Sequence, residues 1–341
     1  IELSVNVDVI NKGDFRFNVG AIYNYNRNKL DELPNADQYL YSSYWGSSSL
    51  VPTNDYMFVE GKAIGLVRGF ISEGYYTVDD FNYTNGQYVL KEGVPDITKA
   101  LTATYMHPYD LPAGQTAFPG AAKFRDVDES GTVDLDDATC LGEVMPRHTG
   151  SFQLNFNYKN FDLSTNFNWT AGGKVYNVAA MINASGQEFD GIGAQRASWV
   201  ADAFKVYNVN AAGDLYAVTN PDELRALNAN AKYHLPYHQS GITSSEWLEN
   251  GSYLRLQTLT LGYTLPKNWL AKVHVDKIRL YLTATNLFTI TGYSGIDPEV
   301  NANPTGQSGF YSDLRIFPTL NMDFGTYPRA RTFTFGANIT F

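Results

Sequence analysis

The clearest candidate for chemistry in the sequence is the acidic segment from Asp126 to Asp137. Oxygen-bearing side chains recur in it with the spacing of calcium-binding loops, in which ligands stand at positions 1, 3, 5, 9 and 12 and a backbone carbonyl serves at position 7. Gly131 occupies position 6, where such loops make a sharp turn. The predicted ligands are Asp126, Asp128, Ser130, Thr132, Asp134 and Asp137.

Two departures reduce the ligand charge of this segment. Position 12 is Asp137 rather than a bidentate glutamate, and position 5 is Ser130. We therefore expect weak Ca²⁺ or Mg²⁺ binding, with a dissociation constant of about 10⁻⁴–10⁻³ M. The alternative is a solvated acidic turn that needs no metal. Either role is structural, because no general base or nucleophile accompanies the carboxylates.

The sequence gives little support for catalysis. It contains no nucleophile elbow, phosphate-binding loop or pair of catalytic carboxylates. We therefore predict that the protein is not an enzyme. A surface hydrolase with a catalytic aspartate cluster is kept as a weaker alternative.

The composition favours β structure over helices. The 341 residues include 24 Tyr, 20 Phe and 29 Gly but only 18% charged residues, and ring side chains suit a pleated surface. The net charge of −10 argues against nucleic acid as a partner, since phosphates are bound by clustered Lys and Arg. The single cysteine, Cys140, cannot form an internal disulfide.

No apolar run approaches the roughly 18 residues of a spanning helix, but barrel strands escape that test because only every second residue is apolar.

Alternation with a period of two residues predicts where the strands lie. Residues 1–10 and 15–26 form a predicted hairpin around a turn at 11–14, in which Gly13 can take a positive φ. A second predicted hairpin joins 151–159 to 161–170. Further strands are predicted at 252–265, 276–288 and 331–341. The first of these three changes parity near Gln257, which predicts a bulge.

The lengths of the loops between the strands favour one of two ways of covering the apolar faces. A soluble sandwich would turn them inward, whereas an outer-membrane barrel turns them to lipid and needs strands of roughly 9–11 residues. Short turns at one end and long loops at 27–60, 171–251 and 289–330 are typical of a barrel. We therefore predict an all-β transmembrane antiparallel barrel with long extracellular loops. Segments 62–77 and 120–127 could supply two further crossings.

The predicted loops carry other features. Asn220 followed by Pro221 predicts the start of a helix that ends near Lys232. Several loop aromatics could stack on sugar rings or clamp a peptide, although any one of them could instead pack within a loop or lie at the membrane interface, as we expect for Trp169. These substrate candidates are Tyr39, Tyr41, Tyr44, Trp45, Tyr75 and Tyr76.

Four blocks of the sequence resemble one known family. KFRDVDESGTVDLDDATCLGEVMPRHTGSFQLNFNYKNFDLSTNFNWTAGGKVYN (123–177) is similar to the acidic loop and hairpin of SusC/RagA-type TonB-dependent outer-membrane proteins. SYLRLQTLTLGYTLPKNWL (252–270), IRLYLTATNLFTITGYSGIDPEV (278–300) and YPRARTFTFGANITF (327–341) resemble the closing strands of that family in order and spacing. The terminal Phe341 resembles the signal that the outer-membrane assembly machinery reads.

This resemblance implies a fold and a function. The fold is a 22-stranded barrel filled by a plug domain, of which residues 1–341 would be the C-terminal part. The function is import of an oligosaccharide or peptide across the outer membrane of a Bacteroidetes-like Gram-negative bacterium, with a SusD-like lipoprotein as lid and the TonB complex as energy source. The plug and the first barrel strands are absent from the chain, which begins at Ile1 inside a strand, so we expect a fragment or processed piece.

The partners implied are therefore the remaining barrel and plug, the SusD-like lipoprotein, the TonB complex, and lipid or lipopolysaccharide around the wall. The sequence alone leaves a second binding function open. A secreted β-sandwich lectin or adhesin stabilised by Ca²⁺ would show the same alternation, with its apolar faces sealed between two sheets.

Overall fold

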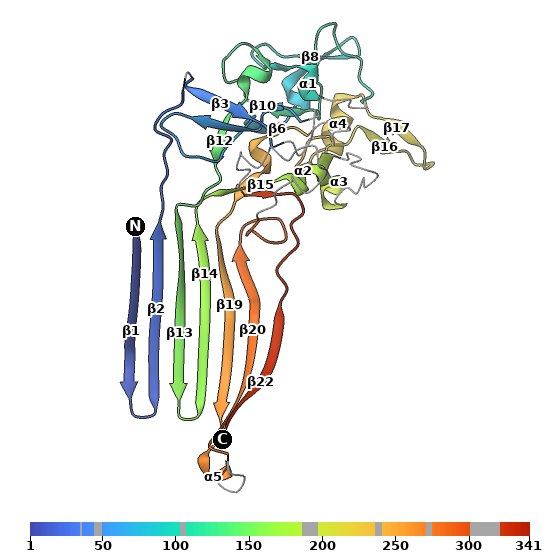
Figure 1. The fold of residues 1–341 in the computed structure, drawn as a ribbon. Coiled ribbons are helices and arrows are strands. Elements are labelled where there is room, and N and C mark those ends of the chain that lie inside the picture. Colours follow the sequence, from blue (N-terminus) through green and yellow to red (C-terminus); the bar gives the residue numbers. More distant parts are fainter. Residues whose placement is uncertain are drawn as a thin grey trace, which may run out of the picture.

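The structure is a computed structural model of the 341-residue chain, and it describes residues 1–34, 36–43, 50–102, 107–185, 197–235, 241–270, 275–300 and 321–341. Figure 1 shows one sheet of long strands with a cap of shorter strands and helices at one end. None of the helices in this described part has the length and apolar character needed to cross a lipid bilayer.

Seven long strands form a single antiparallel sheet in the order β1-β2-β13-β14-β19-β20-β22. All seven predicted strands are confirmed, and the all-β prediction with them. Their bounds are β1 Glu2–Lys12, β2 Phe15–Tyr25, β13 His148–Tyr158, β14 Phe161–Ala171, β19 Tyr253–Thr264, β20 Lys277–Thr291 and β22 Thr332–Thr340.

The predicted turns and bulge are also confirmed. Gly13 has φ 58° and Lys159 has φ 52°, so each tight hairpin contains a left-handed residue. The register between β19 and β20 shifts between Leu256 and Thr258. An extra residue on one strand produces such a shift, which explains the change of parity in the sequence.

The prediction of two further crossings at 62–77 and 120–127 is wrong. Strand β2 pairs with β13 along its whole length, so no strand lies between them. The two segments form short cap strands instead: β5 (Leu66–Gly69) pairs with β12 (Thr139–Glu143), and β6 (Ser72–Tyr75) pairs with β10 (Ala122–Phe124). Four residues of strand extend only about 13 Å, which is too short to cross a bilayer.

The two faces of the long sheet differ in polarity. One polar row runs across all seven strands in register and consists of Asp8, Asn18, Asn155, Ser164, Thr260, Thr283 and Thr334. A neighbouring row on the other face is apolar and consists of Ile10, Phe17, Phe156, Leu163, Leu261, Leu282 and Phe335. Among the described residues the apolar face carries no second sheet, and Phe335 is 73% exposed. The alternative of a β-sandwich requires these side chains to be buried between two sheets, whereas in the described part of the chain none of them is buried.

Hydrogen bonds join side chains along the polar row. Asn18 donates to Asp8 (2.9 Å) and also to Asn6 (2.7 Å). Ser164 donates to Asn155 (2.6 Å), and the hydroxyls of Thr260 and Thr283 lie 2.9 Å apart. Neighbouring strands are thus joined on the polar face by side-chain hydrogen bonds as well as by the backbone ladder.

The cap contains the rest of the described strands and most of the helices. Its strands are β3 Gln38–Tyr41, β4 Tyr56–Val59, β5, β6, β7 Phe81–Thr84, β8 Gln87–Leu90, β9 Asp96–Ile97, β10, β11 Thr132–Val133, β12, β15 Lys174–Asn177, β16 Tyr207–Val209, β17 Leu215–Ala217, β18 Leu248–Asn250 and β21 Met322–Asp323. Its helices are η2 Val78–Asp80, α1 Lys99–Thr102, η3 Leu135–Asp137, α2 Val178–Ser185, α3 Ala197–Asp202, α4 Pro221–Leu227 and η4 Ser245–Trp247, while α5 (Lys267–Leu270) lies at the opposite end of the sheet (Figure 1).

The helix predicted after Asn220 is confirmed at its start. The Asn220 side chain accepts hydrogen bonds from the amides of Asp222 and Glu223, as an N-cap does. The helix ends at Leu227, earlier than the predicted Lys232. The carbonyl of Leu224 accepts hydrogen bonds from both the backbone amide (3.2 Å) and the side chain (3.0 Å) of the C-cap residue Asn228, and the next amide, of Ala229, donates to Ala226 instead of continuing the helical pattern.

The apolar core of the protein lies in the cap. One cluster of buried side chains surrounds Tyr76, Tyr88 and Phe118. A second surrounds Tyr41, Tyr176 and Trp247, next to the end of the long sheet. The long sheet itself contributes few fully buried residues, since no second sheet packs on it among the residues that the structure describes.

Candidate binding pocket and acidic loop

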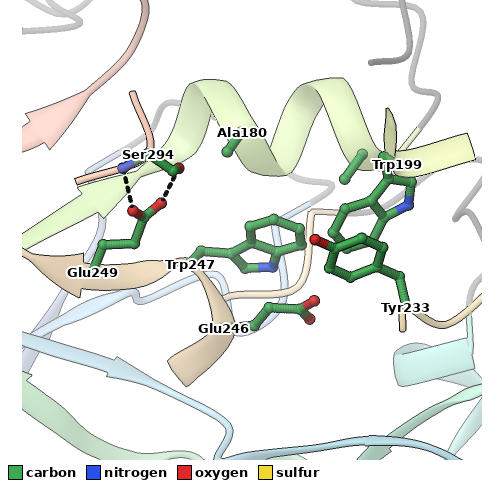
Figure 2. Close-up of a pocket in the computed structure, with 8 residues that line it drawn as sticks. Ala180, Trp199, Tyr233, Glu246, Trp247, Glu249 and Ser294 are labelled. Carbon is green, nitrogen blue, oxygen red and sulfur yellow. Dashed lines mark hydrogen bonds between the residues drawn. The ribbon is translucent and has the colours of Figure 1, made fainter. Parts of the chain in front are cut away.

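A pocket of about 200 Å³ lies in the cap beside the second core cluster. It lies among α2, α3, η4 and β18, so its wall is assembled from segments far apart in the sequence (Figure 2). The lining residues are Ala180, Ala184, Trp199, Tyr233, Glu246, Trp247, Glu249 and Ser294.

Three aromatic rings form one side of this pocket. Trp199, from α3, stacks on Tyr233 with ring centroids 3.9 Å apart and an angle of 17° between the planes. Trp247, at the end of η4, lies with its centroid 5.3 Å from that of Trp199. Both tryptophans are buried, so packing holds the rings in place.

Glu246 provides a carboxylate among these rings. In Figure 2 the carboxylate is drawn below the rings of Trp247 and Tyr233, which line the same pocket. Burial raises the pKa of Glu246 to about 7, because the ionised form loses hydration there. Its Oε2 atom lies 3.7 Å from Nε2 of His234, whose own pKa burial lowers to about 4. At neutral pH this imidazole is uncharged and does not neutralise Glu246.

Glu249 is the second carboxylate of the pocket, and neutral donors hold it. Its Oε1 accepts hydrogen bonds from Asn177 (2.7 Å) and from the Ser294 hydroxyl (2.7 Å), and its Oε2 accepts the Ser294 amide (2.7 Å). Within the described part of the chain, neither pocket glutamate forms an ion pair with Lys or Arg. The pocket therefore combines aromatic faces with two carboxylates that have no Lys or Arg partner among the described residues, which suits binding rather than catalysis.

Sequence reasoning missed this pocket. Its residues extend from Ala180 to Ser294 and follow no local spacing, so no motif could bring them together. The only signal was the adjacent pair Glu246-Trp247, which is an acid beside a ring and is common in loops.

The acidic loop folds much as its spacing predicts. Side-chain oxygens of Asp126, Asp128 and Asp137 all lie within 4.8 Å of one another. Gly131 takes φ 86°, which supplies the sharp turn expected at position 6. Ions coordinated at about 2.4 Å hold opposite ligand atoms at most about 4.8 Å apart, so these three carboxylates fit a Ca²⁺ ion.

Backbone amides already bind the same carboxylates. Asp137 is buried and accepts hydrogen bonds from Val127 (2.5 Å) and Asp134 (2.8 Å), while Asp126 accepts from Gly131 (2.7 Å). The remaining predicted ligands contribute to the turn: Ser130 donates to the carbonyl of Thr132, and Asp134 caps η3. The loop thus holds its shape through its own hydrogen bonds, and metal coordination stays a prediction.

The predicted substrate aromatics occupy different environments. Tyr39 is exposed. Tyr41 and Tyr76 are buried in the cap cores, so stacking on a solute would first require their rings to be uncovered. Tyr75 is half-buried, and its hydroxyl donates to the carbonyl of Ala231. Tyr44 and Trp45 lie outside the described residues.

Comparison with known proteins gives one consistent group. No family model matches the sequence. The TonB-dependent receptor P3 of Formosa agariphila is 28% identical over all 341 residues of this chain, which covers 28% of that receptor. The TonB-dependent receptor SusC of Bacteroides thetaiotaomicron is 26% identical over 246 residues, or 70% of this chain and 19% of SusC. The chain therefore spans less than a third of the length of these relatives.

A solved structure shares the fold. The structure of the RagAB peptide transporter matches all of this chain with a TM-score of 0.61 and 20% sequence identity, and the match covers 29% of that protein. These relatives are receptors and transporters rather than enzymes, as the absence of catalytic motifs predicts. The resemblance seen in the sequence blocks is thereby confirmed, and the chain is related to TonB-dependent receptors of the SusC/RagA type.

Proposed function

We propose that this chain forms part of the wall and the extracellular cap of an outer-membrane nutrient importer. The observation that carries the proposal is the single long sheet, with an exposed apolar face and a hydrogen-bonded polar face. Lipid would cover the apolar face, and the polar face would line the lumen. A water-soluble protein would expose that apolar surface to solvent at a large cost.

The placement of aromatic side chains supports a membrane setting. Near the cap end of the sheet, Tyr23 stacks beside Trp169. Near the hairpin end, Tyr158 and Phe161 are exposed. From Gly150, the partner of Trp169, to Tyr158 the strand covers eight residue steps of about 3.4 Å, or roughly 27 Å. Aromatic girdles separated by an apolar band of about this size are typical of outer-membrane barrels.

The rest of the proposal concerns parts beyond this chain. Strands β1 and β22 each have only one neighbour among the described strands, and an open edge is not tolerated in lipid. We infer that further barrel strands pair with these edges, that a plug fills the lumen and contacts the TonB complex, and that a SusD-like lipoprotein closes over the cap. The imported solute would be an oligosaccharide or a peptide, and one structural relative is named a peptide transporter.

A pair of lysine substitutions on β13 tests which face meets lipid. Leu154 lies near the middle of the apolar face, and its neighbour Gln153 lies on the polar face opposite Gly20. Leu154→Lys places a charge in hydrocarbon and should destabilise the inserted protein by about 2–4 kcal/mol, whereas Gln153→Lys should change stability by less than about 1 kcal/mol. Urea unfolding of the intact protein in lipid vesicles measures both. Equal effects, or a larger effect of Gln153→Lys, would contradict the proposed orientation.

We also propose that the acidic loop binds Ca²⁺ as a structural ion. The close carboxylates of Asp126, Asp128 and Asp137 support this role. With a dissociation constant of about 10⁻⁴–10⁻³ M, 10 mM Ca²⁺ would stabilise the folded loop by about 1.4–2.7 kcal/mol. Hydrogen exchange of the loop amides with and without Ca²⁺ measures this gain. An unchanged exchange rate would show that the loop is an acidic turn that does not bind Ca²⁺.

Two substitutions distinguish the role of these carboxylates in metal binding from their role in the hydrogen bonds of the turn. Asp137→Ala leaves the partly buried amides of Val127 and Asp134 without their carboxylate acceptor. Amide exchange in the loop should therefore be faster even in chelator, by the equivalent of about 1–3 kcal/mol of local stability. Asp128→Asn keeps one acceptor oxygen, so we expect it to abolish the calcium response with little change in chelator. If Asp128→Asn retains the full calcium response, the assignment of Asp128 as a ligand is wrong.

A further inference from the structure

We propose that the cap pocket lined by Trp199, Tyr233, Glu246 and Trp247 binds a protonated primary amine carried by the imported solute. This inference rests on the proposed import function and assigns a chemical class to one contact of the solute. The amine could be a lysine side chain or amino terminus of a peptide, or the amino group of an amino sugar. All of these present the same charged donor.

The rings favour a cation over a neutral group. Aromatic faces carry negative electrostatic potential and attract an ammonium group within about 6 Å of the ring centroid. Trp199, Tyr233 and Trp247 supply three such rings within one small space, with neighbouring centroids 3.9 and 5.3 Å apart. A desolvated ammonium group gains more from such rings than an exposed one does.

The carboxylates favour the same class. Glu249 is occupied by Asn177 and Ser294, so Glu246 is the acceptor available to a ligand. The described neighbours of Glu246 supply no positive charge, since burial lowers the pKa of His234, 3.7 Å away, to about 4 and no Lys or Arg forms an ion pair with the carboxylate. A neutral sugar hydroxyl would leave the buried charge uncompensated, whereas an ammonium group would neutralise it and donate up to three hydrogen bonds.

The size of the pocket points to a side group rather than a whole solute. Its volume of about 200 Å³ is smaller than the roughly 300–1,000 Å³ of pockets that enclose a drug-sized molecule. It can hold an aminoalkyl group and a few water molecules. The side chain of Glu246 is 23% exposed, so the carboxylate can be reached from solvent.

Calorimetry on the intact protein in detergent at about pH 7, where the amino groups of the probes are mostly protonated, tests the inference with matched probes. The peptide pair is Ala-Lys-Ala and Ala-Gln-Ala with blocked ends, and the sugar pair is glucosamine and glucose. We expect at least one amine probe to bind about tenfold or more tightly than its neutral partner, and Glu246→Gln to remove that preference. Glu92→Gln, an exposed glutamate outside the pocket, should keep it.

Two further measurements separate the possible failures. Glu246→Asp keeps the charge and should restore part of the preference, which a purely structural role of Glu246 would not predict. Uptake of labelled Ala-Lys-Ala and glucosamine by cells carrying the protein is measured separately from binding, as a test of the import function. Binding of an amine without uptake of any solute would overturn the import function but keep the pocket assignment. Equal binding of charged and neutral probes, or a preference unchanged in Glu246→Gln, would overturn the amine inference alone.

Discussion

Glu246 makes the stability of the cap depend on pH. Its pKa rises from an ordinary value of 4.5 to about 7 in the folded protein, because the ionised carboxylate is largely removed from water. Below pH 4.5 the group is protonated in both the folded and unfolded states and costs nothing. As the pH rises from 4.5 to about 7, the unfolded state ionises while the folded state retains the proton, so stability is lost over this range; above about 7 the folded state buries the charge and the loss is complete.

Removing that charge should therefore stabilise the cap only at high pH. We predict that Glu246→Gln slows hydrogen exchange around η4 at pH 8 by an equivalent of about 1–3 kcal/mol and has little effect at pH 4. Rates are corrected for the intrinsic pH dependence of exchange, and Glu92→Gln serves as the exposed control. A stabilisation of equal size at both pH values would show that burial of the charge is not the cause.

At the scale of the element, two glycines in one pair of strands have different tasks. In β13, a Cβ on Gly150 would lie 2.4 Å from the carbonyl oxygen of Ile22 and 2.7 Å from the Trp169 ring, so the residue lets a neighbouring strand and a ring approach closely. In β2, a Cβ on Gly20 would have its nearest neighbour, in Gln153, at 3.9 Å. Only the first position requires glycine on steric grounds.

We accordingly expect opposite tolerance at the two positions. Gly150→Ala forces backbone atoms of β2 and β13 apart and should destabilise the sheet by about 2–4 kcal/mol, while Gly20→Ala should be neutral within about 1 kcal/mol. The measurement is urea unfolding in lipid vesicles, monitored by the mobility difference between folded and unfolded protein on a gel. Comparable losses for both variants would argue against the register in which β2 pairs with β13.

The same elements show how far the sequence could be interpreted. The long strands were predictable because each has one apolar face and one polar face, so alternation appears in the letters, and the bulge beside Gln257 appears as a change of parity. The short cap strands β5 and β6 were not, because strands of four residues in a packed cap show no such period and were mistaken for crossings. The acidic loop is a local motif with readable spacing, whereas the pocket around Glu246 depends on tertiary contacts.

At the scale of the whole molecule, the sheet separates two ends with different character. The cap lies at one end, and the tight turns that join β1 to β2 and β13 to β14 lie at the other (Figure 1). Outer-membrane barrels place long loops outside the cell and short turns on the periplasmic side. The proposed import function requires this orientation, because a solute must meet the cap pocket before it enters the lumen.

Single cysteines test the orientation in intact cells. The native Cys140 is exposed and is first replaced by serine, so that its thiol cannot react with the label. Ala212→Cys lies in the exposed turn between β16 and β17 of the cap, and Asp14→Cys lies in the turn between β1 and β2. A maleimide attached to a polymer too large to cross the outer membrane should label Ala212→Cys in intact cells and Asp14→Cys only after permeabilisation. The reverse pattern would place the pocket on the periplasmic side, where it could not receive an incoming solute, and the import function would then have to be abandoned.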